Sequence, residues 1–418
     1  MKRLRLLVRP CYLALVVPGL MLGVSAQVSS AWAQGSLIPP GTPAPTMKTL
    51  AQIEPRIAIT NTGFLTISQP GSYYLTTNIT VNSGAAINIT ADNVTVDLNG
   101  FTLFSTASLA NGSAILLSGG TLPRSDILVM NGHVRGGVTN NSGTYSGSGF
   151  LNGVYYAGPQ PVNCRVANVS VSGCGLHGIY LGGDPTEVES CTVRNVGGYG
   201  IVASRITRCS AYFCGNVAIY AYVASDCYGY ATSGSDAVFA RVANNCFGIA
   251  ATNGIGINAI TAQNSYGQSD VSHGVSGSVV TSCYGVSVLS SGSGGSGVNA
   301  QVAQNCYGLS HSFGQSGIRA YAAANCYGHS TDGEGVTAWR SAQSCVGESE
   351  NTMDGIFAGT LALNCEGEGG AGVEAQIAVY CYGTGDTRSG VIATIANCCM
   401  GTSRKAAGVS AEYKYNMP

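Results

Sequence analysis

A four-residue pattern, Asn-Cys-Tyr-Gly, recurs through the C-terminal half of the chain at an interval of about 19 residues. It stands at 305–308 and 325–328, and with Phe in place of Tyr at 245–248. A second pattern, Gly-(Val/Ile)-x-Ala, runs in phase with the first, as at 297–300 and 317–320. A repeat of this length cannot bury its own apolar face, whereas stacked copies bury a continuous core. The chain is therefore predicted to form a solenoid.

The small and apolar residues of each repeat alternate, which is typical of short strands with one buried face. Helical repeats are disfavoured because charged residues make up only 9% of the 418 residues and helix-forming surface residues are scarce. Gly at fixed places is expected to permit the tight corners. We predict an all-β, right-handed, single-stranded parallel β-helix of roughly 17 coils over residues 57–411, each coil adding about 4.8 Å along the axis.

Cysteine is the most regular marker of the repeat. We interpret the cysteine column as a structural ladder of thiols on an inward face, acting as small apolar groups. Disulfides between neighbouring rungs are the alternative, since adjacent rungs lie within bridging distance, and we favour thiols because a large β-core needs no covalent staples. No Cys-x-x-Cys pair occurs, so no metal site is expected. The predicted ladder consists of Cys227, Cys246, Cys283, Cys306, Cys326, Cys345, Cys365, Cys381 and Cys399.

The residue before each cysteine is usually Asn. Stacked Asn side chains form amide ladders, and we expect this column to satisfy backbone groups at a corner in that way. The N-terminal half alternates less regularly, and residues 139–149 are predicted to be a loop that projects from one rung.

Two stretches of the N-terminal half, 93–101 (Asn-Val-Thr-Val-Asp-Leu-Asn-Gly-Phe) and 131–136 (Asn-Gly-His-Val-Arg-Gly), resemble the early coils of secreted right-handed parallel β-helix proteins of the pectin-lyase-like superfamily. The resemblance implies the fold and a polysaccharide partner. The family's catalytic motifs are matched only in part. Residues 175–178 read Gly-Leu-His-Gly where polygalacturonases have Gly-His-Gly, and 184–187 has Thr where alginate epimerases have a catalytic His.

The N-terminus has the features of an export signal. A basic start is followed by an apolar stretch that ends near Val24 and by the small-x-small pattern Ala31-Trp32-Ala33. We predict a signal peptide at 1–33, a Pro-rich spacer and cap at 34–56, and a C-terminal tail at 412–418. A membrane anchor is the alternative, disfavoured because Pro18 interrupts a short apolar run. The mature protein is expected to have no membrane span and to be secreted, periplasmic or on the cell surface.

The charge of the chain limits its partners. The formal net charge is −1, with 19 basic and 20 acidic residues. A nucleic-acid partner is not expected, because nucleic-acid-binding proteins carry a basic surplus.

The residue after each cysteine is usually aromatic. If the cysteines point inward, alternation turns Tyr284, Tyr307 and Tyr327 outward. Two interpretations stay open at this point: the rings stack on sugar rings of a bound polysaccharide, or they pack on one another and cover the sheet.

Acidic residues gather in the last coils. His329, Glu348 and Glu368 each stand three residues past their cysteine, so they are expected to form one line. Two carboxylates one rung apart are separated by about 5 Å, as in retaining glycosidases, and carboxylate clusters also bind calcium. The other interpretation is a solvated acidic edge. We predict no cofactor, with calcium as an option.

These features lead to three functional hypotheses. The favoured one is an exported, non-catalytic surface or adhesion-like protein that binds carbohydrate along its elongated face. The second is a polysaccharide lyase, glycoside hydrolase or epimerase that uses the acidic residues or the 131–136 region. The third is a structural spacer.

Overall fold

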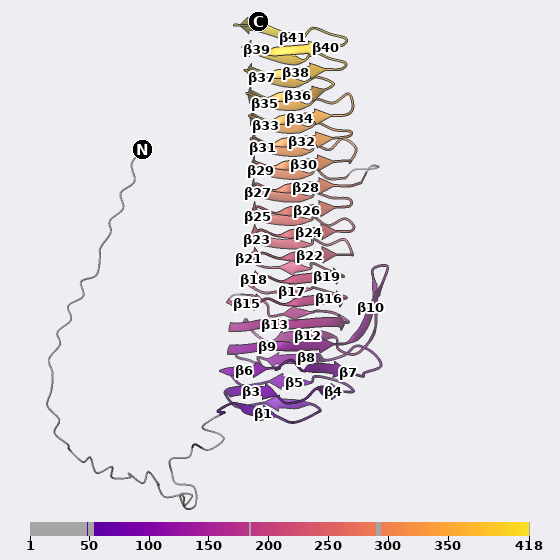
Figure 1. Cartoon of the computed structure of the whole chain (residues 1–418), viewed down its shortest axis with the longest axis vertical. Helices are drawn as coiled ribbons and strands as arrows, with labels where there is room; N and C mark the ends of the chain where they lie inside the picture. The colour runs from indigo at the N-terminus through magenta and orange to yellow at the C-terminus, as the bar shows by residue number, and fades with distance from the viewer. Residues whose placement is uncertain (1–47, 49–53, 184, 290–293, 418) are drawn as a thin grey trace, which may run out of the picture. The chain divides into compact units, whose positions relative to one another are not determined.

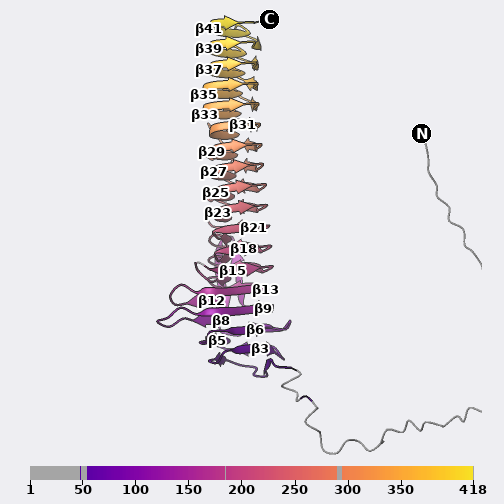
Figure 2. The ribbon, with the colours of Figure 1, turned by 90° about the vertical axis from the view of Figure 1, so that its left-hand side faces the viewer.

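The computed structural model describes residues 48, 54–183, 185–289 and 294–417. The predicted signal peptide at 1–33 and most of the predicted spacer and cap lie outside these residues. From Pro55 onward the chain forms one compact unit, in which it winds as a parallel β-solenoid (Figures 1 and 2). In the described part of the chain, no helix has the length and apolar character needed to cross a membrane.

Three ladders of strands run along the solenoid, and almost every strand pairs in parallel with the equivalent strand one turn later. The first ladder has one strand from each turn. These strands are β1 (Ile57–Ile59), β3 (Gly71–Leu75), β6 (Val94–Asp97), β9 (Ser125–Arg135), β13 (Val162–Cys174), β15 (Thr186–Glu189), β18 (Arg205–Thr207), β21 (Val223–Ser225), β23 (Val238–Asn244), β25 (Ile257–Gln263), β27 (Val275–Thr281), β29 (Val298–Gln304), β31 (Ile318–Ala324), β33 (Val336–Gln343), β35 (Ile356–Leu363), β37 (Val373–Val379), β39 (Val391–Asn397) and β41 (Val409–Tyr415).

The second ladder follows the cysteine corner and includes the C-terminal parts of β9 and β13. Its other strands are β4 (Ile79–Val81), β7 (Thr102–Ser105), β16 (Thr192–Val196), β19 (Ser210–Cys214), β22 (Tyr228–Ala231), β24 (Phe247–Ala250), β26 (Tyr266–Ser269), β28 (Tyr284–Ser287), β30 (Tyr307–Ser310), β32 (Tyr327–Ser330), β34 (Val346–Ser349), β36 (Glu366–Gly369), β38 (Tyr382–Gly385) and β40 (Met400–Ser403).

The third ladder is separate only in the N-terminal half. From β23 onward, one longer strand per turn serves both the third and the first ladder. The strands of the third ladder alone are β2 (Leu65–Ile67), β5 (Ile87–Ile89), β8 (Ser113–Ser118), β12 (Asn152–Ala157), β14 (Ile179–Tyr180), β17 (Ile201–Val202) and β20 (Ile219–Tyr220).

The register places equivalent residues of successive turns over one another. Tyr284 pairs with Tyr307, and Tyr307 pairs with Tyr327. The parallel β-helix predicted from the repeat is therefore confirmed, and the strands of the first ladder agree with the roughly 17 coils expected. Its right-handed winding stays a prediction. The last strand, β41, runs on to Tyr415, so strand structure continues into the predicted C-terminal tail.

The residues that precede the cysteines form a corner of each turn, and they do so by adopting a left-handed backbone conformation. Each residue of this column from Ser190 on has a φ of 49° to 54°, the left-handed region that Asn and Asp tolerate best. An amide contact along the column, such as that from Asn245 Nδ2 to Asp226 Oδ1 at 3.1 Å, is made by only some members. The predicted amide ladder is therefore present only in part, and the left-handed backbone is the feature that all members of the column share. The members are Ser190, Arg208, Asp226, Asn245, Asn264, Ser282, Asn305, Asn325, Ser344, Asn364, Tyr380 and Cys398.

The repeated glycines serve close approach across the core. A Cβ placed on Gly308 would lie 2.1 Å from the carbonyl oxygen of Gly317, and one on Gly328 would lie 2.0 Å from that of Gly335. Neither Gly308 nor Gly328 has a positive φ. The expectation that these glycines form the corners was wrong, because Asn and Ser occupy that conformation and glycine brings two strands of one turn together.

Residues 137–148 leave the solenoid as a hairpin of β10 (Gly137–Asn141) and β11 (Thr144–Ser148), visible beside the lower turns in Figure 1. The predicted loop is thus a pair of antiparallel strands. Its Tyr145 hydroxyl lies 2.7 Å from Thr232 Oγ1, which ties the hairpin to a later turn.

Candidate ligand-binding surfaces

The aromatic residues after the cysteines form one continuous stack along the axis. The ring centroids of Tyr284 and Tyr307 are 4.6 Å apart with an interplanar angle of 4°, and those of Tyr307 and Tyr327 are 4.8 Å apart at 17°. These rings stack because equivalent residues in neighbouring parallel strands are separated by one rung, about 4.8 Å. The tyrosine ladder, as we call it, begins with Tyr212, which lies three residues after Cys209, and continues through Tyr228, Phe247, Tyr266, Tyr284, Tyr307 and Tyr327.

This stacking decides how the ladder can meet a ligand. Both faces of Tyr284 and of Tyr307 are covered by neighbouring rings, so no sugar ring can stack on them. The rings are still partly exposed, and Tyr284 retains 37% of its surface. The ladder therefore offers ring edges and a row of hydroxyl groups, which bind by hydrogen bonds.

A shallow groove of about 550 Å³ runs beside the ladder. Its lining includes tyrosines of the ladder and the corner residues Asn264, Asn305 and Asn325. These three residues are exposed, and their side-chain amides make no hydrogen bond within the described part of the chain. The rung of Tyr307 thus brings a hydroxyl and the amide of Asn305 to the groove, and the preceding rung adds the hydroxyl of Tyr284.

The predicted acidic line is formed in register. His329 pairs with Glu348, and Glu348 pairs with Glu368. The Tyr327 hydroxyl donates a hydrogen bond of 2.5 Å to Glu348 Oε2, and His329 Nε2 lies 3.2 Å from Glu350 Oε1. Two members of the line are therefore engaged by side chains of neighbouring residues.

The surroundings of the acidic line are as follows. Burial and the hydrogen bond to Glu348 raise the pKa of Tyr327, so its hydroxyl holds its proton and is a poor base. His329, Glu348 and Glu368 do not line any of the five best-defined hollows among the described residues. Within the described residues, no three His, Cys, Asp or Glu side chains are grouped to hold a metal ion. The catalytic role and the calcium option stay predictions.

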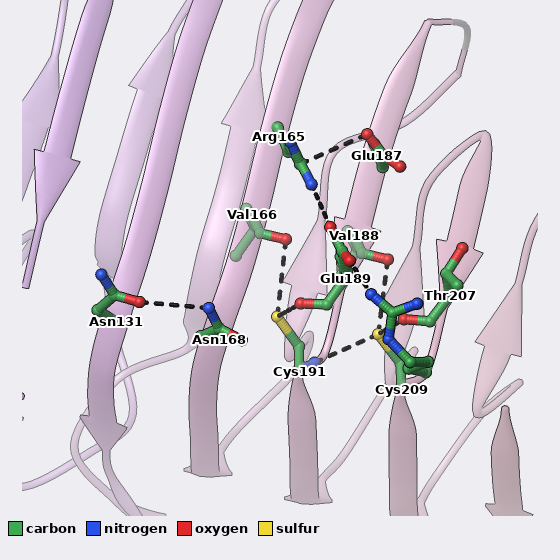
Figure 3. Close-up of polar contacts among 11 residues, drawn as sticks. Asn131, Arg165, Val166, Asn168, Glu187, Val188, Glu189, Cys191, Thr207 and Cys209 are labelled. Atoms are coloured by element: carbon green, nitrogen blue, oxygen red, sulfur yellow. Dashed lines mark hydrogen bonds and ion pairs between the residues drawn. The ribbon is translucent and has the colours of Figure 1, made fainter. Parts of the chain in front are cut away.

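The cysteines of the column are buried, and Figure 3 shows the sulfur atoms of Cys191 and Cys209 beside backbone carbonyl groups. Cys209 Sγ contacts the carbonyl oxygen of Thr207 at 3.2 Å, two residues earlier, and that of Val188 at 3.5 Å, on the preceding turn. The same pair of contacts recurs at Cys306, with Gln304 and Val280. The thiol thus links adjacent turns through backbone acceptors.

All the cysteines in the described residues are free thiols, and only Cys398 is more than marginally exposed. Burial raises the pKa of Cys283 to about 12 and that of Cys174 to about 12. Nucleophilic attack requires the thiolate, so the thiols of Cys283 and Cys174 are chemically quiet and act as packing groups.

A second aromatic surface lies where the third ladder turns into the first. It surrounds a hollow of about 540 Å³ lined by Tyr220, Tyr222, Phe239 and Ile260. The Tyr220 and Phe239 rings stack at 5.1 Å, and the Arg241 guanidinium lies 4.8 Å from the centre of the Tyr222 ring. Sequence reasoning missed this surface.

The signal for this second surface was present in the Gly-(Val/Ile)-x-Ala pattern. The position x and the position after Ala both point outward, because they alternate with the buried residues of the strand. Reading those two columns alone gives aromatic residues at 220, 222 and 239 and again at 321, 339 and 357. The residues of these two columns vary from turn to turn, so the repeat does not reveal them.

No protein-family model, no curated relative and no solved structure matches this chain. The resemblance of 93–101 and 131–136 to the pectin-lyase-like superfamily therefore stays a prediction, and the parallel β-solenoid is established by its own strand pairing.

Proposed function

We propose that this protein is an exported, non-catalytic surface protein that binds an elongated polysaccharide along the groove beside the tyrosine ladder. The observation that carries the proposal is the groove itself, which is lined by Tyr284 and Tyr307 and by the corner residues Asn305 and Asn325. Such a row of donors and acceptors matches a polymer whose hydroxyl groups also recur at regular intervals.

The mode of binding differs from sugar stacking. Because the ring faces are covered by neighbours, the contacts are hydrogen bonds from phenol hydroxyls and side-chain amides. Each contributes modestly, so affinity comes from engagement of several rungs at once. The proposal thus favours long chains over short oligosaccharides.

Affinity electrophoresis of the purified protein in gels that contain neutral or acidic polysaccharides tests this proposal. We expect at least one polysaccharide to retard the protein. The double variant Tyr284→Phe/Tyr307→Phe removes two hydroxyls and preserves the stack, and we expect it to weaken binding about tenfold. Asn305→Gly/Asn325→Gly removes two amides and still permits the left-handed corner, with a similar loss.

Tyr382→Phe is the matched control, since Tyr382 is 40% exposed and lies outside the stack and the groove. Its binding should equal that of the unmodified chain. Unchanged binding by both double variants would place the polysaccharide elsewhere, and absence of retardation by every polysaccharide would reject the function.

The same polysaccharides, incubated with and without calcium and analysed for products, test the non-catalytic part of the proposal. Turnover that disappears in Glu348→Gln or Glu368→Gln would establish the enzymatic alternative and the acidic line as its site. Export is tested by mass determination of the protein recovered from outside the producing cell, with an N-terminus near residue 34 expected.

A further inference from the structure

A hollow of about 390 Å³ on the C-terminal turns gathers groups of opposite charge between aromatic rings. Its lining includes the cation of Arg319, the anion of Glu334, the hydroxyls of Ser316 and Thr337, and the ring of Trp339. Phe357 completes the apolar part of the wall. We call it the Arg319 pocket.

Arg319 is held by packing alone. Its guanidinium lies over the Trp339 ring, 5.1 Å from the ring centre. No hydrogen bond or ion pair connects Arg319 to another side chain in the described part of the protein, although the residue is half-buried. A stacked guanidinium keeps its in-plane N–H donors available for a carboxylate.

Glu334 lacks a cation partner. Its Oε2 accepts long hydrogen bonds of 3.4 Å from Ser316 Oγ and from Thr337 Oγ1. Those two hydroxyls are 2.6 Å from each other and bond mainly to one another. The described residues show no ion pair between Glu334 and Arg319, so a positive and a negative group face the same hollow without neutralising each other.

The next turn shows the same position with its partner in place. Asp354 occupies the position of Glu334 one turn later, since Val336 pairs with Ile356. Arg388 covers it and donates to Asp354 Oδ1 at 2.8 Å, while also bonding Glu374. At Asp354 the carboxylate is thus neutralised by an arginine. At Glu334, the equivalent position one turn earlier, the described residues supply no such cation.

We infer that the Arg319 pocket binds a small zwitterionic ligand, an α-amino acid with an aromatic side chain. Its carboxylate pairs with Arg319 and its ammonium with Glu334, in place of the arginine that covers Asp354. Its ring packs against Trp339, which is 54% exposed, and Phe357. This site is independent of the polysaccharide groove, because the two share no residue.

Isothermal titration of the whole protein with L-phenylalanine and two singly charged analogues tests the inference. 3-Phenylpropionate lacks the ammonium, and 2-phenylethylamine lacks the carboxylate. We expect phenylalanine to bind at least about tenfold more tightly than either analogue, because each analogue forfeits one charge-assisted hydrogen bond. L-Alanine, which lacks the ring, should bind more weakly than phenylalanine.

Two variants separate recognition from a structural role. Glu334→Gln should weaken phenylalanine about tenfold and leave 3-phenylpropionate unchanged, whereas Arg319→Gln should weaken phenylalanine and leave 2-phenylethylamine unchanged. Arg340→Gln, an exposed neighbour outside the pocket, is the control and should bind all three compounds as the unmodified chain does. No heat of binding at millimolar phenylalanine, equal affinity for the analogues, or a uniform loss with all three compounds would each overturn the inference.

Discussion

The two halves of the solenoid solve the same packing problem with different side chains. In the N-terminal turns the core is filled by large residues such as Leu75, Ile87 and Leu103, none of which is exposed. In the described residues, no buried Leu or Phe follows Leu181. Beyond that point the buried apolar side chains are Ile, Val, Ala and Cys, with buried Ser among them and with glycines pressed against carbonyl groups, as at Gly308.

The difference teaches what sets the width of a solenoid. Large side chains hold opposite walls apart and supply much apolar burial per turn. In the C-terminal turns, glycines let the backbones of opposite walls of the solenoid come into contact. The smaller apolar burial per residue is offset by this close packing. Buried hydroxyl and thiol contacts also contribute, such as the hydrogen bond from Ser330 Oγ to the Gln315 carbonyl at 2.7 Å. The regular repeat follows, because a narrow core tolerates few residue types.

The largest expected effect is in the N-terminal turns, whose core holds the larger side chains and is called the wide core; the core of the C-terminal turns is called the narrow core. Leu103→Ala leaves a cavity among packed side chains and should lower the free energy of unfolding by about 2–5 kcal/mol. Ala303→Gly, at a buried position of the narrow core, removes a single methyl group and should cost about 1 kcal/mol. Urea unfolding followed by hydrogen exchange in each half measures both. Equal losses would contradict the difference between the two cores.

Overpacking should affect the narrow core next. Gly308→Ala places a Cβ 2.1 Å from a backbone carbonyl oxygen, and we expect a loss of about 1–3 kcal/mol as the turn is forced apart. Gly63→Ala, where the new Cβ meets only a side chain at 3.7 Å, is the control and should change little. Thermal unfolding compares the two, and a silent Gly308→Ala would show that the walls are further apart.

Replacing a residue that is strained by its left-handed backbone conformation should stabilise the C-terminal turns. Tyr380 has a φ of 53°, in the region that disfavours most L-residues by about 1–2 kcal/mol. Tyr380→Asn should therefore raise the unfolding free energy by about 1 kcal/mol. Tyr382→Asn, two residues later in strand β38, lacks that corner conformation and should show no gain. A gain in both variants would point to removal of exposed aromatic surface as the cause.

The smallest effect is expected in the cysteine column. Ser265 occupies a cysteine position and bonds the Gln263 carbonyl at 2.8 Å, so Cys326→Ser should cost less than about 1 kcal/mol. Cys326→Leu overpacks the same place and should cost more. Thiol titration of the denatured, unreduced protein should find the cysteines reactive, and extensive pairing would replace the thiol column with disulfides.

The sequence predicts the stacking of turns well because that stacking depends on repetition. The interval between Cys306 and Cys326 was enough to place Tyr307 over Tyr327, since every turn of a parallel ladder must keep the same register. The same argument placed His329 beside Glu348.

Other properties depend on details that repetition does not encode. Asn is typical both of amide ladders and of left-handed backbone, so the pattern before Cys306 could not tell the two apart. Alternation gives the side on which Tyr284 lies, whereas the tilt that turns its face to the next ring depends on packing. Arg319 and Trp339 meet across two turns whose outward residues do not repeat, and only the assembled structure brings them together.

The register makes sequence number a measure of position along the axis. Deleting the 20 residues from Tyr307 to Cys326 would carry Tyr284 directly onto Tyr327 and leave the column intact, with the molecule shorter by a single turn. Deleting one residue within β30 would instead exchange its inward and outward side chains. Such a protein changes length in whole turns, so duplication or loss of a gene segment matched to one turn is the mutation that it absorbs most easily.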